Sequence, residues 1–129
     1  MKINEIIEER MHYRGVNQTM VCKECGLVVQ NFNAFLKGNR NLTTENLVKV
    51  MELLNLTWKK DDSAFSPNLI EDKVKACLKD CKEKMVTIAK TTNVSGSTLS
   101  TIVNEKRKMS AKVLYALIDY FGFEVATIK

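Results

Sequence analysis

The sequence lacks the features that mark several large classes of protein. No apolar run among its 129 residues approaches the roughly 20 residues that a membrane-spanning helix needs. The start, Met1-Lys2-Ile3, lacks the apolar core of a signal peptide. Gly-rich phosphate loops, Cys–His and Ser–His–Asp patterns and metal-hydrolase signatures are also missing. We therefore expect a cytoplasmic protein that is not an enzyme and uses no cofactor.

Metal ligands are scarce and poorly spaced. His12 is the only histidine and has no partner motif. The four cysteines form the pairs Cys22/Cys25 and Cys77/Cys81. Structural zinc motifs separate such pairs by roughly 12 to 20 residues, whereas a far longer segment separates Cys25 from Cys77. Cysteines one helical turn apart can simply pack in a core, and a reducing cytosol disfavours a disulfide. We predict neither a metal site nor a disulfide.

The composition is that of a soluble globular protein with a basic bias. Lys and Arg number 20 against 15 Asp and Glu, which gives a net charge of +5. This excess is compatible with a polyanionic partner but does not identify one. A length of 129 residues allows one ordinary domain or two very small ones.

The most informative pattern spans residues 93–110. It contains an apolar stripe at the i, i+3, i+4 spacing of a helix packed on one side: Leu99, Ile102 and Val103. The opposite face carries small polar residues: Ser97, Thr98, Ser100 and Thr101. The basic run 106–108 follows at once. A slender polar helix flanked by cations is what DNA groove binding requires.

An earlier segment repeats this pattern. Residues 27–36 align with 94–103 at an offset of 94 − 27 = 67 positions, which places Phe32 on Leu99 and Arg40 on Arg107. The match lies in side-chain character more than in identity, as expected for two diverged copies of one small fold. We therefore predict an all-α protein with helical domains at 1–57 and 69–129, joined by a linker at 58–68.

Local signals predict where several helices begin and end. Asn17 is a suitable N-cap for a helix over 18–25, and Gly26 can end that helix in the left-handed conformation. In the second copy Asn93 takes the position of Gly26, and Ser110 caps the last helix.

The segment 58–68 has the charged, Pro-containing composition of a linker. Trp58 and Phe65 nevertheless predict that parts of it are pinned to a domain surface. Residues 123–128 alternate with the period of a strand, and the first copy has no equivalent. Because a lone strand needs a partner, either this chain or a second subunit supplies one, and a homodimer through this strand is one prediction.

The motif V-S-G-S-T-L-S-x-I-x-N-x-K-R-K at 94–108 resembles the helix-turn-helix core of the Cro/cI-like (XRE-type) family of small bacterial and phage DNA-binding proteins. Asn17-Gln18 and Gly26 in the first copy are similar to the phage-repressor subset. The resemblance implies a sequence-specific regulator of transcription, most simply a repressor, of bacterial, phage or mobile-element origin. An acidic residue often follows the apolar pair of the third helix in this family, whereas Leu36 and Val103 occupy that place here.

The resemblance also implies roles for individual residues. Base reading falls to the third helix of each copy: Val29, Gln30, Asn33, Ala34, Gly96, Ser97, Ser100 and Thr101. Gln30 and Asn33 can pair with an adenine edge, and Val29 or Ala34 can pack on a thymine methyl. Phosphate contacts fall to polar and basic residues around these helices: Gln18, Lys37, Asn39, Arg40, Asn41, Lys106, Arg107 and Lys108.

Two alternatives stay open. Antitoxins, phage-encoded inhibitors and adaptors reuse this scaffold to hold a protein, and the apolar residues Val28-Val29 and Phe32 to Phe35 favour that role for the first copy. A sequence-indifferent DNA binder is the other. Salt dependence distinguishes DNA binding from protein binding.

Overall fold

The computed structural model describes residues 3–81, 84–105 and 109–127. Within them the fold is mostly helical, with eight α-helices and one small sheet in place of the all-α fold expected. The first half contains α1 (Ile3–Arg14), α2 (Gln18–Cys25), α3 (Val29–Leu36), α4 (Thr44–Leu53), β1 (Leu56–Lys60), β2 (Ser63–Phe65) and the 3-10 helix η1 (Pro67–Leu69). The second half contains α5 (Ile70–Asp80), α6 (Met85–Thr92), α7 (Gly96–Glu105), α8 (Ala111–Phe121) and β3 (Glu124–Thr127). None of these helices is long and apolar enough to cross a membrane.

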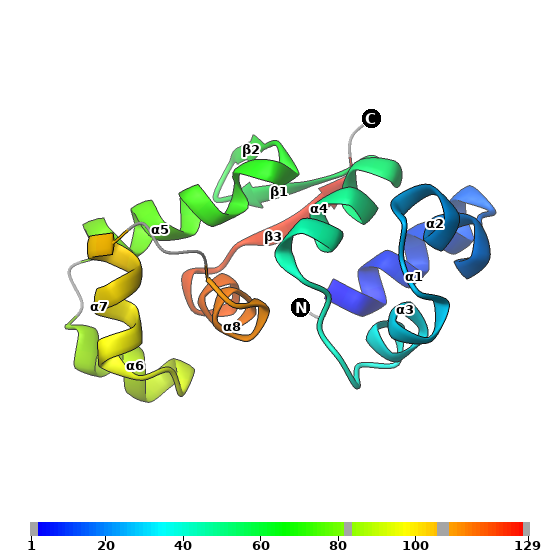
Figure 1. The fold of residues 1–129 in the computed structure, drawn as a ribbon. Helices are drawn as coiled ribbons and strands as arrows, with labels where there is room; N and C mark the ends of the chain where they lie inside the picture. Colours follow the sequence, from blue (N-terminus) through cyan, green and yellow to red (C-terminus); the bar gives the residue numbers. More distant parts are fainter. Residues whose placement is uncertain (1–2, 82–83, 106–108, 128–129) are drawn as a thin grey trace.

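The helices recur at the offset found in the sequence. α1 and α5 begin 70 − 3 = 67 residues apart, and the same difference separates α2 from α6, α3 from α7 and α4 from α8. In the first half α3 packs against α1 and α2, and α4 against α2; in the second, α7 packs against α5 and α6, and α8 against α6. Figure 1 shows the two groups on opposite sides of the molecule, with β1 and β3 crossing between them.

The predicted local signals set these bounds. The Asn17 side chain accepts a hydrogen bond from the Met20 amide at 2.9 Å, and Gly26, at φ 68°, ends α2 at Cys25. Asn93 ends α6 in the same left-handed conformation, at φ 59°. At the start of α8 the Ser110 hydroxyl accepts from the Val113 amide at 3.3 Å. Each signal acts within its own turn of chain, so it does not depend on tertiary contacts.

Residues 58–68, expected to be a linker, are folded. β1 pairs antiparallel with β2, and Trp58 in β1 is fully buried, so the prediction that Trp58 is pinned down is confirmed. Of the charged residues that suggested a tether, Lys59 and Lys60 end β1, and Asp61 and Asp62 form the turn between the strands. Asp61 adopts the left-handed conformation there, at φ 55°, which Asp tolerates better than most residues.

The predicted C-terminal strand is present as β3, and the first half does have an equivalent. β1 follows α4 as β3 follows α8, which corrects the expectation that the first copy lacks a strand. The two strands pair antiparallel, with Trp58 opposite Val125. Because 58 + 67 = 125, each of these residues faces its own counterpart. β3 thus finds a partner within this chain, and a homodimer through it stays a prediction.

The core is one hydrophobic cluster that runs through both halves. Phe32 and Phe35 stack with ring centroids 6.1 Å apart in the first half. Between the halves, Phe65 of β2 meets Phe123 edge to face at 5.8 Å. The sheet is therefore held by side-chain burial as well as by its hydrogen bonds.

Gly26→Ala should lower the free energy of unfolding by about 1 kcal/mol, because an alanine at φ 68° is strained in the left-handed region. An added Cβ would meet no atom within 4 Å, so the whole effect is conformational. Gly96→Ala is the matched control, since its Cβ site is equally open but its φ is not positive. It should be neutral or stabilising in urea denaturation. Equal losses in the two variants would contradict this account.

Candidate nucleic-acid interface

α3 presents its predicted base-reading residues away from the core. Phe32, Phe35 and Leu36 are buried, which leaves the opposite face of the helix outward. Val29 and Gln30 are exposed, and Asn33 and Ala34 are half-buried. No charged residue lies within the helix, so this face can approach another surface without desolvating an ion.

α7 presents hydroxyls that are already partly engaged. Ser97 and Ser100 are exposed and Thr101 is half-buried. Thr101 Oγ1 donates to the Ser97 carbonyl oxygen at 2.9 Å, and Asn104 Nδ2 donates to Ser100 Oγ at 3.2 Å. Bonds within the helix compete with bonds to a partner. The α7 hydroxyls therefore offer fewer free groups than the amides of α3, although Ser97 and Ser100 are exposed.

Ser95 lies just before α7 and caps the start of this helix. Its hydroxyl accepts from the Thr98 amide at 3.2 Å and lies 2.6 Å from the Thr98 hydroxyl, so it caps the start of α7. The signal was present, because a Ser placed three residues before another polar residue at a helix start is typical of an N-cap.

The predicted phosphate-contacting residues of the first half surround α3. Arg40 Nη1 donates to Asn31 Oδ1 at 2.7 Å, which ties the guanidinium to the first turn of that helix. Lys37, Asn39 and Asn41 are exposed, and Gln18 is half-buried. Lys106, Arg107 and Lys108 lie outside the described residues.

A polar residue of the first helix in each half bonds to the main chain at the end of the third helix or shortly after it. Asn4 Nδ2 donates to the Leu36 carbonyl oxygen at 3.1 Å, and Glu71 Oε1 accepts from the Met109 amide at 2.9 Å. These two residues are counterparts, since 4 + 67 = 71. This role could not be predicted from the sequence, because both residues look like solvent-facing positions of an amphipathic helix.

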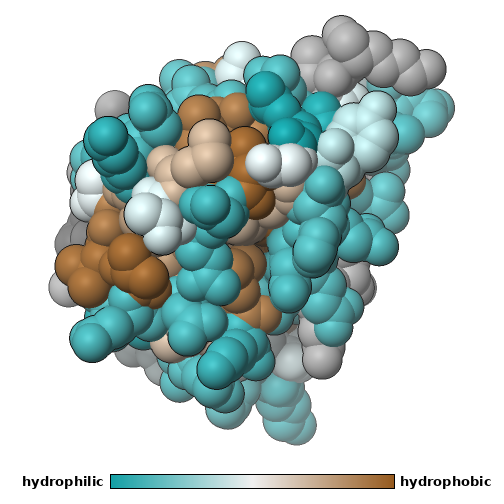
Figure 2. All heavy atoms as spheres, turned by 90° about the vertical axis from the view of Figure 1, so that its right-hand side faces the viewer, coloured by the Kyte–Doolittle hydropathy of each residue, from teal (hydrophilic) through white to brown (hydrophobic). Residues whose placement is uncertain are grey.

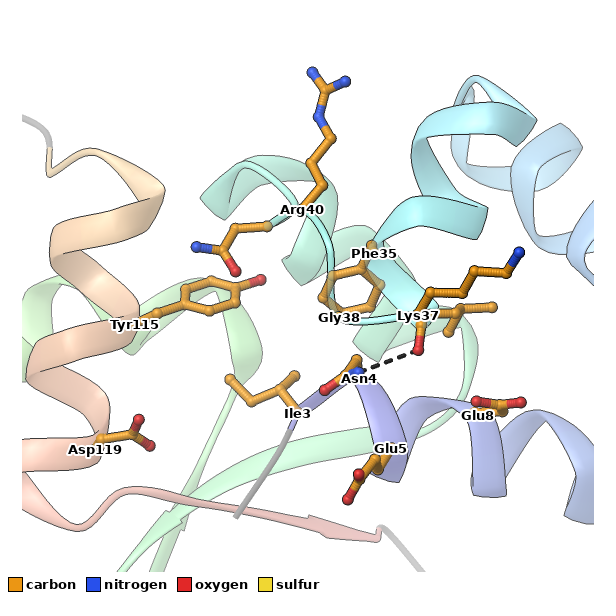
Figure 3. A pocket seen from close by; sticks show the side chains of 12 residues that line it. Ile3, Asn4, Glu5, Glu8, Phe35, Lys37, Gly38, Arg40, Tyr115 and Asp119 are labelled. Carbon is orange, nitrogen blue, oxygen red and sulfur yellow. Dashed lines mark hydrogen bonds between the residues drawn. The ribbon is translucent and has the colours of Figure 1, made fainter.

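A cleft of about 470 Å³ lies where α8 approaches α1 and the loop after α3. Figure 3 shows the Tyr115 ring reaching into it from α8, whereas the charged ends of Lys37 and Arg40 point away. These cations therefore face outward, where an external polyanion can meet them.

Tyr115 is unusual within this cleft, because its hydroxyl oxygen is buried without a hydrogen-bond partner among the described residues. Burial raises the pKa of the phenol well above its ordinary value. The Leu42 main chain opposes this rise, but the geometry between the two groups falls short of a hydrogen bond. The neutral phenol is thus the form that the fold accommodates.

Apolar side chains also reach the surface of the first half. Val28, Val29 and Met20 are 59%, 46% and 50% exposed. Figure 2 shows the face of the molecule on the right-hand side of Figure 1, where hydrophobic areas alternate with hydrophilic ones. This surface is compatible with thymine methyl groups or with an apolar protein partner.

The described residues contain no group of three or more His, Cys, Asp or Glu side chains that could hold a metal ion. Cys22 and Cys25 are buried, and burial raises the pKa of both thiols. A protonated, buried thiol is a poor nucleophile and a poor metal ligand. Both residues contribute apolar volume to the core.

Tyr115→Phe should raise the free energy of unfolding by up to about 1 kcal/mol at neutral pH, because it removes a buried hydroxyl that lacks a partner. The unfolded phenol ionises near pH 10 and the buried one only at higher pH. Above about pH 10 the unfolded wild type therefore binds fewer protons, so its stability falls as pH rises. The variant should lack this part of the loss.

Urea denaturation at neutral pH and above about pH 10 measures both effects. Tyr13→Phe is the control, since Tyr13 is 80% exposed and should change stability little. A Tyr115→Phe variant less stable than wild type would show that the hydroxyl is satisfied in solution.

No protein-family model, no curated protein and no solved structure matches the chain. A function therefore has to be argued from the geometry of this interface.

Proposed function

We propose that the protein is a sequence-specific double-stranded DNA-binding regulator of transcription, acting in the cytoplasm of a bacterium or on behalf of a phage or mobile element. In this proposal it consists of two tandem helix-turn-helix units, and α3 and α7 enter the major groove. The most direct output is repression, because a protein bound at a promoter blocks polymerase. The observation that carries the proposal is the recurrence, 67 residues apart, of a helix with a buried apolar stripe and an outward polar face.

α3 has the chemistry for direct readout. Gln30 is exposed in the first turn, and the first turns of a recognition helix are the part that reaches base edges. Its amide can bond adenine N6 and N7 together, and Val29 beside it can pack on a thymine methyl. Arg40, held against the first turn by Asn31, is placed to meet a phosphate while α3 lies in the groove.

α7 supports the same binding mode with less discrimination. Gly96 and Ser97 leave its start narrow, which favours close approach to the duplex. Its hydroxyls can either donate or accept a hydrogen bond, so they can pair with several different bases. The intrahelical bonds of Ser100 and Thr101 reduce this contribution further.

A second candidate function is protein binding by the first half. The exposed Val28 and Val29, on or beside a helix without charge, favour it. Such a partner would be held mainly by apolar burial, so its affinity would change little with salt. DNA binding through several phosphates loses affinity steeply as salt rises.

Arg40→Ala should weaken binding to every duplex and lower the slope of log affinity against log salt by about 0.9, because one phosphate contact is lost. Lys49→Ala is the matched control. It removes the same charge from α4 in the same half, where Lys49 pairs with Glu45 at 3.8 Å. Fluorescence anisotropy over a salt series measures both slopes. The groove model fails if the two variants change the slope equally.

Gln30→Ala should relax the preference at one base pair, with a loss of about 1–3 kcal/mol of discrimination. The counterpart variant Ser97→Ala should change discrimination less, since Ser97 reads bases weakly. Binding to a duplex set with each central base pair changed in turn gives both profiles. An unchanged Gln30→Ala profile would remove α3 from base readout.

A further inference from the structure

The sequence repeat leaves open how two reading units would lie on one duplex. Units strung along a linker favour half-sites in direct repeat, whereas units related by a two-fold axis require inverted half-sites. The β1–β3 pairing distinguishes these arrangements. Thr57 pairs with Ala126, Trp58 with Val125 and Lys59 with Glu124. With the offset of 67, this register maps onto itself when the strands are exchanged, so the strand pair has a local two-fold axis at Trp58 and Val125.

The same relation extends from the strands into the helical groups. α4 joins β1 through Asn55, at φ 56°, and α8 joins β3 through Gly122, at φ 76°. These residues are counterparts, because 55 + 67 = 122. Their amides also donate to counterpart carbonyls, of Glu52 at 3.2 Å and Asp119 at 3.3 Å. Each helical group is therefore joined to its strand by the same left-handed turn, and Figure 1 places α3 and α7 on opposite sides of the strand pair.

A second copy of the chain is not needed to create this symmetry. The two halves share one continuous hydrophobic cluster, and Trp58 at the centre of the strand pair is fully buried. The distance between α3 and α7 is thus set by the fold, not by a flexible tether. A duplex bound by both helices must present its half-sites at one matching spacing.

The two-fold relation holds for the strand pair and the turns that lead into it, but not for the groups that would read bases. α3 offers the amides Gln30 and Asn33, whereas the counterpart positions in α7 are Ser97 and Ser100. The amides favour adenine, and the hydroxyls discriminate weakly. The half-site facing α3 should therefore contain A·T pairs at fixed positions, and the half-site facing α7 should tolerate substitution.

We infer that one chain binds one duplex whose two half-sites are inverted, chemically unequal and held at a single spacing. This inference rests on the proposed DNA-binding function. It adds the orientation, the spacing and the stoichiometry of the site.

The first test selects bound duplexes from a random pool with the full-length protein and varies the selected site. One probe reverses the half-site facing α7 to give a direct repeat, and another adds about half a DNA turn between the half-sites. Each change should cost at least about tenfold in affinity, the loss expected when contacts to a few base pairs are given up. Titration above the dissociation constant should give one chain per duplex.

A transplanted variant gives the sharper test. Gly96→Val, Ser97→Gln, Ser100→Asn and Thr101→Ala together copy the α3 reading set onto exposed or half-buried positions of α7. Selection with this variant should return a palindrome of the α3 half-site. The wild-type probes still decide the matter if the variant does not fold, which circular dichroism would reveal.

The possible failures are distinguishable. No sequence enrichment with the wild type would overturn the proposed function itself. Enrichment with equal affinity for inverted and direct probes, two chains per duplex, or a direct repeat selected by the variant would overturn the inference and leave DNA binding intact.

Discussion

The antiparallel pairing of β1 with β3 fixes how the two halves of the molecule sit together. Two short strands pair only marginally in water, so their hydrogen bonds cannot hold this arrangement alone. Burial of Leu56 and Trp58 in β1, and of Phe123 just before β3, supplies the rest, since each large apolar side chain removed from water contributes about 1.5–3 kcal/mol. Because Trp58 pairs with its own counterpart, Val125, this register also sets the relation between the helical groups that lead into the two strands. The geometry of α3 relative to α7 follows from one strand register.

The two halves are not identical, because a single chain can carry different elements in each half. β2 and η1 extend the first half only, and α5 packs against α8, whereas α1 instead packs mainly against α3. Three buried side-chain polar atoms have no hydrogen-bond partner among the described residues, and none has an equivalent in its counterpart residue: Thr44 Oγ1, Trp58 Nε1 and Tyr115 Oη. A true homodimer would have to repeat every such defect twice. Two halves in one chain can confine each unpartnered atom to one half, and the outward faces of α3 and α7 can differ.

Features that depend on a few neighbouring residues were predictable from the sequence, and features that depend on distant ones were not. Asn17 and Gly26 were identified because a cap works within a single turn of helix. β1 was missed because its Lys59-Lys60 end and the following acidic turn resemble a solvated tether, and its apolar alternation spans only Leu56 and Trp58. The contacts of Asn4 and Glu71 arise from tertiary distances that no local pattern encodes. The outward placement of Val29 and Gln30 on α3 was anticipated, whereas the bonds within α7 were not, despite the i, i−4 spacing of Thr101 and Ser97.

The charge distribution bears on how such a protein would discriminate among sites. α3 carries no charge, and in the described part of the first half its cationic neighbours are Lys37 and Arg40, with neutral amides beside them. Non-specific affinity for DNA comes almost wholly from phosphate neutralisation, whereas base-edge contacts act only at the cognate site. Under the proposed function, a surface with few cations and several amide and methyl groups would therefore bind random sequence weakly and gain most of its affinity from the correct bases. A rigid pair of unequal helices would increase this preference for the correct sequence, because the second helix would bind only when the first is in register. In that case discrimination would come from the fold that couples the helices as much as from the side chains that would touch DNA.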